Sequence, residues 1–516
     1  MNPDAAIETE GHHQTAKSAA GMTTKVVKGT AWTLAGLVVP IVVSLFATPV
    51  VTRLLGAEAY GVFVLVLLIP TYFSFADLGM NLASTKFGSE AFAEGAPERE
   101  ARVVRTAGLI AVVTSLPLAA AMIIFSRGIV AIFNVPEHLV AEAAFALKLA
   151  GVIFVVNFLN NIFNTPELTR LRMDLNTSIT SGVRVAGIVL TPVVIYLGGG
   201  ISGAVAVALC VSLATLVGHI IVSARLLPEL FGLSLERDAV RPMLKFGLSL
   251  MVAFIAVALL ANLEKFVLAR VASVETLAYY SIAATFAALL TVFSGSMAQS
   301  LMPAFSQLQR EHDRAALTAL YSRGIRVTLI GLVPAVVLMV LSGRPFFTYW
   351  FSEDFGREST VPFYIIAAGF LFTVVAYFPY TVVMAAGRSD VFAKIYWMEL
   401  VPYLILVWLL AARFGAVGAA VAWSLRAALD AVLLFVLAGK VAHIAFAPRK
   451  LPQFAAALAI MLVPLAALAF FPNVSVPVIA TTAAALAAYS VFAAVFLLEP
   501  EEIDWLKGRA RLYLTR

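Results

Sequence analysis

Ionisable side chains inside long apolar stretches are the residues of this sequence that could do chemistry. Arg184 stands about nine residues into such a stretch, and Glu399 stands 215 residues later, deep in another. A charge in the hydrocarbon region of a membrane costs roughly 2.5–3.5 kcal/mol on insertion scales, so it normally faces a cavity or a partner. We interpret Arg184 and Glu399 in two ways: they line a charged cavity that binds an anionic headgroup or exchanges an ion, or they pair and join two halves of the chain.

Five further charges lie within or near the ends of apolar stretches. Lys148 either faces a cavity or extends toward the outer headgroups. Glu264 and Lys265 are adjacent and therefore point to different faces of a helix, and Glu264 is a candidate for a cavity-facing role. Arg426 and Asp430 are one helical turn apart, so we expect them to pair with each other.

The remaining candidates stand near the ends of the apolar stretches. Asp77 either caps a helix end or takes part in ion coupling. Arg53 and Arg270 either anchor helices at the outer interface or contact substrate. A patch of four asparagines predicts hydrogen bonds between helices, with sugar contact as the alternative. These are Asn157, Asn160, Asn161 and Asn164.

The elements that carry these charges are predicted to be membrane helices. The chain has 516 residues, of which 61% are hydrophobic and 13% charged, whereas soluble domains have about 45–50% and about 25%. We therefore expect an all-α polytopic membrane protein of about 14 transmembrane helices. The expected spans are 30–52, 59–80, 103–125, 141–163, 175–197, 200–223, 244–266, 276–302, 324–346, 360–386, 391–411, 416–440, 452–472 and 474–498.

The basic residues predict the orientation. If both termini are cytoplasmic, 26 of the 36 lysines and arginines lie on the cytoplasmic side. This agrees with the positive-inside rule, by which cytoplasmic segments carry an excess of basic residues. Residues 1–25 are then expected to be a disordered cytoplasmic tail, and residues 499–516 a second cytoplasmic tail. This distribution explains the basic charge without nucleic acid as a partner.

The first twelve spans contain an internal repeat. "TRLLGAEAYGVF" from Thr52 resembles "ARVASVETLAYY" from Ala269, and the glycine at 203 matches the glycine at 418. Six helices return the chain to the same side, so the copies are parallel. We expect six-helix bundles at 26–225 and 226–441 around a central cavity, with two more helices at 442–498. Alternating access follows from this arrangement.

Enzymatic motifs are absent from the sequence. It has no P-loop, no H-E-x-x-H motif and no cluster of histidine and cysteine with metal-ligand spacing. The expected outer loops at 126–140 and 347–360 are too short for a catalytic domain. We predict a membrane transporter with no catalytic residues, metal or cofactor.

Two segments resemble a known family. "TRLLGAEAYGVFVL" followed by "FADLGMNLASTKFGSEA", and later "NLEKFVLARVASVETLAYYS", are similar to polysaccharide-biosynthesis flippases. These form the oligosaccharide-lipid (Wzx-type) branch of the multidrug/oligosaccharidyl-lipid/polysaccharide (MOP) exporter superfamily. The resemblance covers residues 25–440, with Ala278 in the place of a usual glycine.

The resemblance implies a function. Such flippases move undecaprenyl-pyrophosphate-linked oligosaccharides (O-antigen, exopolysaccharide or capsule repeat units) from the cytoplasmic to the outer leaflet of the bacterial inner membrane. Polysaccharide polymerase and assembly proteins would be partners. Arg184, Lys148 and Lys265 would then contact the pyrophosphate, and Glu264 and Glu399 would couple transport to protons, Na⁺ or the membrane potential.

Three alternatives remain open. A peptidoglycan-precursor flippase of the same superfamily would share the cavity. A drug or cation antiporter of the same fold would have an acid-dominated cavity, whereas Arg184, Lys148 and Lys265 favour an anionic cargo. A membrane-embedded glycan ligase or polymerase is disfavoured by the short outer loops and the repeat.

Overall fold

The computed structural model describes residues 3–232, 234–311, 313–388, 390–444, 451–470 and 476–499. Within these ranges the regular elements are helices, and no strand occurs. Eight helical segments are long and apolar enough to cross a membrane. The prediction of an all-α polytopic membrane protein is confirmed.

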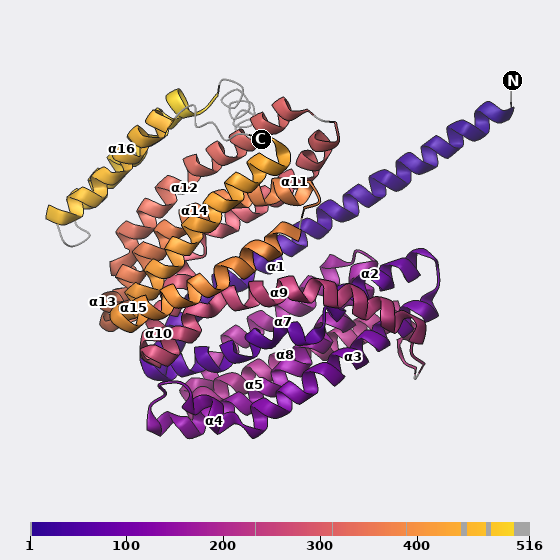
Figure 1. Ribbon diagram of the computed structural model, residues 1–516, viewed down its shortest axis with the longest axis horizontal. Coiled ribbons are helices and arrows are strands. Elements are labelled where there is room, and N and C mark those ends of the chain that lie inside the picture. The colour runs from indigo at the N-terminus through magenta and orange to yellow at the C-terminus, as the bar shows by residue number, and fades with distance from the viewer. Residues whose placement is uncertain are drawn as a thin grey trace. The chain divides into compact units, whose positions relative to one another are not determined.

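The chain divides into two compact units, residues Met1–Asn262 and Leu263–Arg516. Within each unit the long helices run side by side (Figure 1). The first unit contains α1 (Pro3–Leu68), η1 (Ile69–Asp77), α2 (Met80–Ala93), α3 (Pro97–Ile124), α4 (Ser126–Ala131), α5 (Glu137–Phe163), α6 (Thr165–Thr169), α7 (Met173–Val194), η2 (Ile195–Gly199), α8 (Gly200–Leu226), η3 (Pro228–Leu230) and most of α9 (Arg237–Val271).

The second unit contains the end of α9 and the elements after it. These are α10 (Val274–Ala287), α11 (Leu290–Arg310), α12 (Arg314–Trp350), α13 (Glu353–Glu358), α14 (Thr360–Ala385), α15 (Asp390–Ala442), α16 (Leu451–Phe470), α17 (Val476–Phe492) and η4 (Ala493–Leu497). Its core includes the buried side chains of Phe305, Tyr321 and Phe378.

Several predicted pairs of spans form one long helical segment with a break at glycine. Gly56 interrupts α1 with φ 79°, and Gly415 interrupts α15 with φ 55°. Glycine adopts positive φ without the steric cost that other residues incur. The short connections predicted between spans are therefore hinges of a few residues.

Two predicted spans are discontinuous. The span expected at 59–80 leaves the α-helix at Leu68 and continues as the 3-10 helix η1, whose first residues include Pro70. The span expected at 276–302 breaks after Ala287, between α10 and α11. Both breaks fall in the second helix of a repeat, where hydropathy alone shows one apolar stretch.

The structure supports the internal repeat in detail. Gly200 and Gly415 share an unusual backbone conformation, with φ/ψ of 54°/−151° and 55°/−131°. In the first unit the Arg172 Nε donates to Asp174 at 3.0 Å, and in the second Arg388 Nε donates to Asp390 at 3.1 Å. Matching turns and matching ion pairs at nearly the same offset extend the sequence repeat to geometry.

Two boundaries differ from those expected. The division falls at the break in α9 at Asn262 rather than at 225/226, because the first part of α9 packs on the turn before α2. Residues from Pro3 onward belong to α1, although we expected a disordered tail at 1–25. This segment is rich in alanine and contains glutamate and lysine, which favour helix. Residues 500–516 of the predicted C-terminal tail lie outside the described residues.

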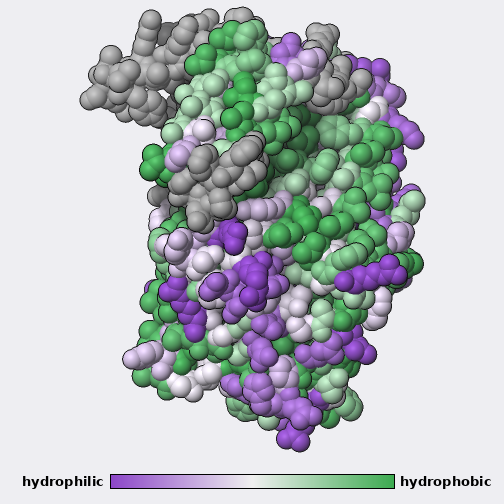
Figure 2. Space-filling view, turned by 90° about the vertical axis from the view of Figure 1, so that its left-hand side faces the viewer, coloured by the Kyte–Doolittle hydropathy of each residue, from purple (hydrophilic) through white to green (hydrophobic). Residues whose placement is uncertain are grey.

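Hydrophilic residues gather on the surface at the ends of the helices. Figure 2 shows hydrophilic patches among hydrophobic surfaces on one face of the molecule. Exposed Arg127 follows α3, and exposed Asp354 and Arg357 lie on α13. These elements correspond to the predicted outer loops.

Candidate functional site

A buried acid begins the candidate site of the second unit. Glu264 lies just after the break of α9 at Asn262, and its side chain is 2% exposed. The Tyr403 hydroxyl on α15 donates a hydrogen bond of 2.9 Å to Glu264 Oε2. The Tyr280 side chain of α10 also lies against this carboxyl group. Glu264 is thus held inside the unit by two tyrosines.

An ion pair on α15 continues the network. Gly415 folds α15 into two arms, which brings Glu399 on the first arm against Arg426 on the second. Arg426 Nε donates to Glu399 Oε2 at 3.2 Å, and the guanidinium lies over the ring of Tyr403 at 5.3 Å. We expected Arg426 to pair with Asp430, and this was wrong. Arg426 pairs with Glu399 instead of Asp430, because the bend at Gly415 brings the first arm of α15 against the second.

Asp430 adds a third carboxyl group. It lies near Glu399 and Arg426 on the second arm of α15. One buried oxygen of each acid, Oε1 of Glu399 and Oδ1 of Asp430, accepts no hydrogen bond from the described residues. Burying a charged oxygen without a partner is costly. We call Glu264, Tyr403, Arg426, Glu399 and Asp430 the acidic network.

The acidic network has more acids than bases. Three carboxyl groups lie near one guanidinium, and Lys265, the residue after Glu264, is half-buried. When all groups are ionised, the network carries an excess of negative charge. A proton or a small cation would compensate this excess, so the arrangement is suited to binding one. Among the described residues no group of three potential ligands has the geometry of a bound metal ion.

The predicted cationic residues of the first unit are exposed. Arg184 on α7 and Lys148 on α5 both present their side chains at the surface of the unit. Neither forms a hydrogen bond or an ion pair with a residue whose side chain is described. Their roles in binding cargo stay predictions.

The repeat explains why Arg184 has no partner among the residues whose side chains are described. The position that matches Arg426 in the first unit is Val211, and the position that matches Asp430 is Thr215. The arm of α8 that packs against α7 therefore offers no acid at this depth. Arg184 and Glu399 occupy matching places, but only Glu399 has an opposite charge beside it within its unit.

The asparagines divide into buried and exposed members. The Asn157 Oδ1 accepts from Ser212 on α8 at 3.0 Å, and buried Asn160 donates to the Ser212 carbonyl at 3.2 Å. These are the helix–helix hydrogen bonds that the sequence predicts. Asn161 is exposed and remains a candidate for sugar contact.

Asp77 has the capping role. Its Oδ1 accepts from the backbone N–H of Gly79 at 2.8 Å, between η1 and α2. Leu78 and Gly79 both have positive φ in this turn. The acid thus stabilises a turn, and nothing in its surroundings indicates ion coupling. Arg53 and Arg270 are exposed beside helix ends, as expected of interfacial residues.

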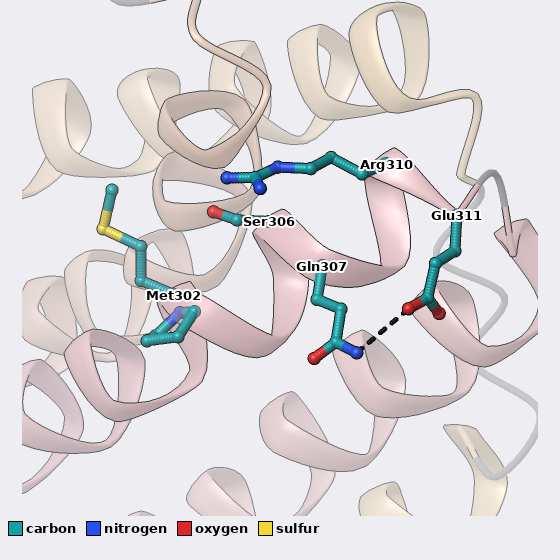
Figure 3. A pocket seen from close by; sticks show the side chains of 6 residues that line it. Met302, Ser306, Gln307, Arg310 and Glu311 are labelled. Atoms are coloured by element: carbon teal, nitrogen blue, oxygen red, sulfur yellow. Dashed lines mark hydrogen bonds between the residues drawn. The ribbon is translucent and has the colours of Figure 1, made fainter. Parts of the chain in front are cut away.

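A hollow of about 730 Å³ lies along one face of α11. Figure 3 shows its lining by Met302, Ser306, Gln307, Arg310 and Glu311 (with Pro303 between them), and Gln307 Nε2 donates to Glu311 at 2.9 Å. The opposite face of α11 carries Phe305, which is fully buried. From the sequence, Arg310 is only one of the basic residues expected on the cytoplasmic side. The hollow could not be predicted from the sequence, because it forms only on the folded helix.

Comparisons with known proteins identify the family to which the chain belongs. A model of the family described as "Polysaccharide biosynthesis protein" matches residues 26–309, which are 284 of the 516 residues. A "Putative O-antigen transporter" of Shigella flexneri is 23% identical over 415 residues, 79% of this chain and 96% of the relative. The "Uncharacterized membrane protein EpsK" of Bacillus subtilis (strain 168) is 23% identical over 369 residues, 67% of this chain and 69% of that protein.

Solved structures share the fold. The lipid II flippase MurJ in an inward closed conformation has a TM-score of 0.69 at 14% identity, over 89% of this chain and 97% of MurJ. An inward-facing multidrug resistance MATE transporter of the MOP superfamily has a TM-score of 0.64 at 12% identity, over 79% and 98%. At these identities the likeness shows a common fold.

Proposed function

Because this chain belongs to the polysaccharide biosynthesis protein family, we propose that it is a flippase for polyprenyl-pyrophosphate-linked oligosaccharides. It moves an O-antigen-, exopolysaccharide- or capsule-type repeat unit from the cytoplasmic to the outer leaflet of the inner membrane by alternating access. The description of the Shigella flexneri relative as an O-antigen transporter supports this cargo class. The flippase fold of MurJ supports a lipid-linked cargo.

The observation that carries the proposal is the exposed Arg184. A guanidinium deep in an apolar helix, with no acid beside it in its own unit, is costly unless it meets water or an anion. A pyrophosphate group supplies such an anion through charge-assisted hydrogen bonds. Lys148 offers a second cation, exposed on α5 of the same unit. A carrier of organic cations would have no use for either.

The acidic network is the proposed coupling site. Its excess of carboxyl groups over guanidinium is reduced when a proton or Na⁺ binds at Glu399 and Asp430, whose buried oxygens lack other partners. Binding would alter the contact between the two arms of α15, which meet through Arg426 and Glu399. A change in that contact is a means of linking ion binding to the movement of helices.

The hollow on α11 is the proposed first contact for the headgroup. Ser306, Gln307 and Arg310 present hydrogen-bond donors along one face. The expected topology places these residues at the cytoplasmic end of their helix, where the cargo would enter. Arg310 would attract the pyrophosphate before the cargo reaches the depth of Arg184.

Translocation in proteoliposomes tests the proposal. We would follow a fluorescent polyprenyl-pyrophosphate oligosaccharide with wild type, Arg184→Ala and the control Arg127→Ala, whose arginine is exposed on α4. We expect Arg184→Ala to reduce the rate at least tenfold and Arg127→Ala to leave it within twofold. A tenfold loss corresponds to about 1.4 kcal/mol, close to the lower limit of about 1.5–3 kcal/mol for a hydrogen bond to a charged group.

Other outcomes select the alternatives. Transport of the glycan lipid that is insensitive to Arg184→Ala would give Arg184 a structural role. Transport restricted to a peptidoglycan precursor would favour the precursor flippase. Transport of a drug or organic cation, without any glycan lipid, would refute the proposal in favour of an antiporter.

A further inference from the structure

A buried histidine–glutamate pair lies in the first unit, outside the site described above. His219 on α8 is 1% exposed, and its Nδ1 lies 2.9 Å from Oε1 of Glu167 on α6, whose side chain is fully buried. The second polar atom of each group, His219 Nε2 and Glu167 Oε2, is buried without a hydrogen-bond partner among the described residues. Such unsatisfied atoms are rare in protein interiors and call for an explanation.

The surroundings of the pair are electrically neutral. Arg170 forms a bidentate pair with buried Glu100, with N···O distances of 2.6 and 3.0 Å, and Thr169 donates to the same acid. Ser84 on α2 and Thr165 on α6 share a hydrogen bond of 2.8 Å. These contacts hold α6 against α2 and α3. The charges of Arg170 and Glu100 compensate each other, so Arg170 does not balance the charge of Glu167. The Glu167–His219 pair must therefore balance its own charge.

Other titratable groups near α6 are engaged elsewhere or exposed. Lys86 lies over the rings of Phe87 and Phe246, and Arg172 pairs with Asp174. On α5, Lys148 is more than four turns from α6 at about 3.6 residues per turn. The exposed groups are Glu90 on α2, Arg225 on α8 and Glu229 after α8.

The repeat supplies an internal comparison for this pair. At the offset that matches Asp174 to Asp390, Glu167 corresponds to Val383, and at the offset that matches Gly203 to Gly418, His219 corresponds to Leu434. Val383 and Leu434 are buried in one hydrophobic cluster of the second unit. The same place in the fold can thus be filled by apolar side chains. Replacing a buried ion pair with well-packed apolar residues is often neutral or stabilising, so stability alone does not require the polar pair.

We infer that Glu167 and His219 form a proton-binding site of the first unit. With His219 neutral and its Nδ1–H donating to Glu167, the pair carries one buried negative charge. A proton from a hydronium ion, which becomes water as its O–H bond breaks, binds at His219 Nε2 and makes an imidazolium–carboxylate pair with no net charge. While α6 and α8 remain in contact and bury the pair, the neutral protonated form is favoured, because a buried net charge is costly. Exposure of the pair to water removes this cost and favours release of the proton. The site is separate from the acidic network of the second unit.

Proton uptake by the purified full-length protein in detergent tests the inference without any substrate. We would compare wild type with His219→Leu, Glu167→Gln and the double variant E167V/H219L, which places the residues of the second unit in the first. The exposed pair of His138 and Glu58, 3.8 Å apart, provides the matched control His138→Leu. The control removes an ordinary surface histidine and shows that the titration detects one group.

Over the whole titration, His219→Leu should take up about one proton fewer than wild type. Glu167→Gln should also take up fewer, because the imidazolium then lacks its counter-charge. Equal uptake by wild type and His219→Leu overturns the inference, since His219 would then be a permanently neutral structural group. If E167V/H219L does not fold, the isosteric Glu167→Gln still decides.

Translocation measured at the same pH values then tests the coupling. In E167V/H219L the dependence of the rate on pH should be weaker than in wild type, while the melting temperature is unchanged or higher. An unchanged pH profile would overturn a role of the pair in transport. Failure of wild type to move any glycan lipid would refute the proposed cargo, but the proton titration would remain readable.

Discussion

Removal of Arg426 should destabilise the second unit. The change Arg426→Gln deletes the 3.2 Å ion pair with Glu399 and the contact with the Tyr403 ring, and it leaves a carboxylate that is 4% exposed beside Asp430. Removing one partner of a buried ion pair costs about 3–5 kcal/mol. We expect a loss near the lower end, about 3 kcal/mol, because 17% of the Arg426 side chain reaches the surface.

Equilibrium unfolding in mixed micelles, followed by tryptophan fluorescence, measures this loss. The control Arg388→Gln breaks the ion pair between Arg388 and Asp390, whose side chains are 54% and 53% exposed. This change should lower the free energy of unfolding by at most about 1 kcal/mol. The double variant E399Q/R426Q should recover most of the stability, because no unpaired charge remains at Glu399. The reasoning is refuted if R426Q is as stable as R388Q, or if the double variant is no more stable than R426Q.

Three further changes test the packing of each unit by the same unfolding measurement. Tyr403→Phe should cost about 1–3 kcal/mol, since it leaves an oxygen of Glu264 without its donor; stability equal to wild type would contradict this hydrogen bond. Glu100→Gln should cost about 3 kcal/mol, because Arg170 would lose a buried carboxylate; a loss below about 1 kcal/mol, typical of a surface pair, would contradict the assignment. Gly79→Ala should destabilise more than the control Gly95→Ala. Both have positive φ, but only at Gly79 would a Cβ meet another backbone, 2.7 Å from the Cα of Gly247; equal losses would show that the close approach is unimportant.

The membrane fold could be predicted because its signals are local or periodic. Apolar stretches of membrane length and the repeated glycine at 203 and 418 give the helices and their parallel repeat. The breaks in the second helix of each repeat were missed, because hydropathy does not distinguish a continuous helix from one that leaves α-helical hydrogen bonding near Pro70 or after Ala287.

The partners within the site depended on tertiary structure. Arg426 and Asp430 satisfied the rule for neighbours one helical turn apart, but the hairpin at Gly415 brought Glu399, 27 residues away, to the guanidinium. The sequence does not single out Glu100 and Arg170, because each lies next to a predicted loop. Their burial follows from the packing of α6, which is too short to be recognised by periodicity.

The two units place their polar groups at different positions of one repeated architecture. In the second unit, Glu399 and Arg426 pair where the first unit has the unpaired Arg184 and Val211. In the first unit, Glu167 and His219 pair where the second has the apolar Val383 and Leu434. If these positions served packing alone, we would expect apolar side chains at them in both copies of the repeat. We therefore propose that the two units have different tasks, with binding of the anionic cargo at Arg184 and ion binding at the acids.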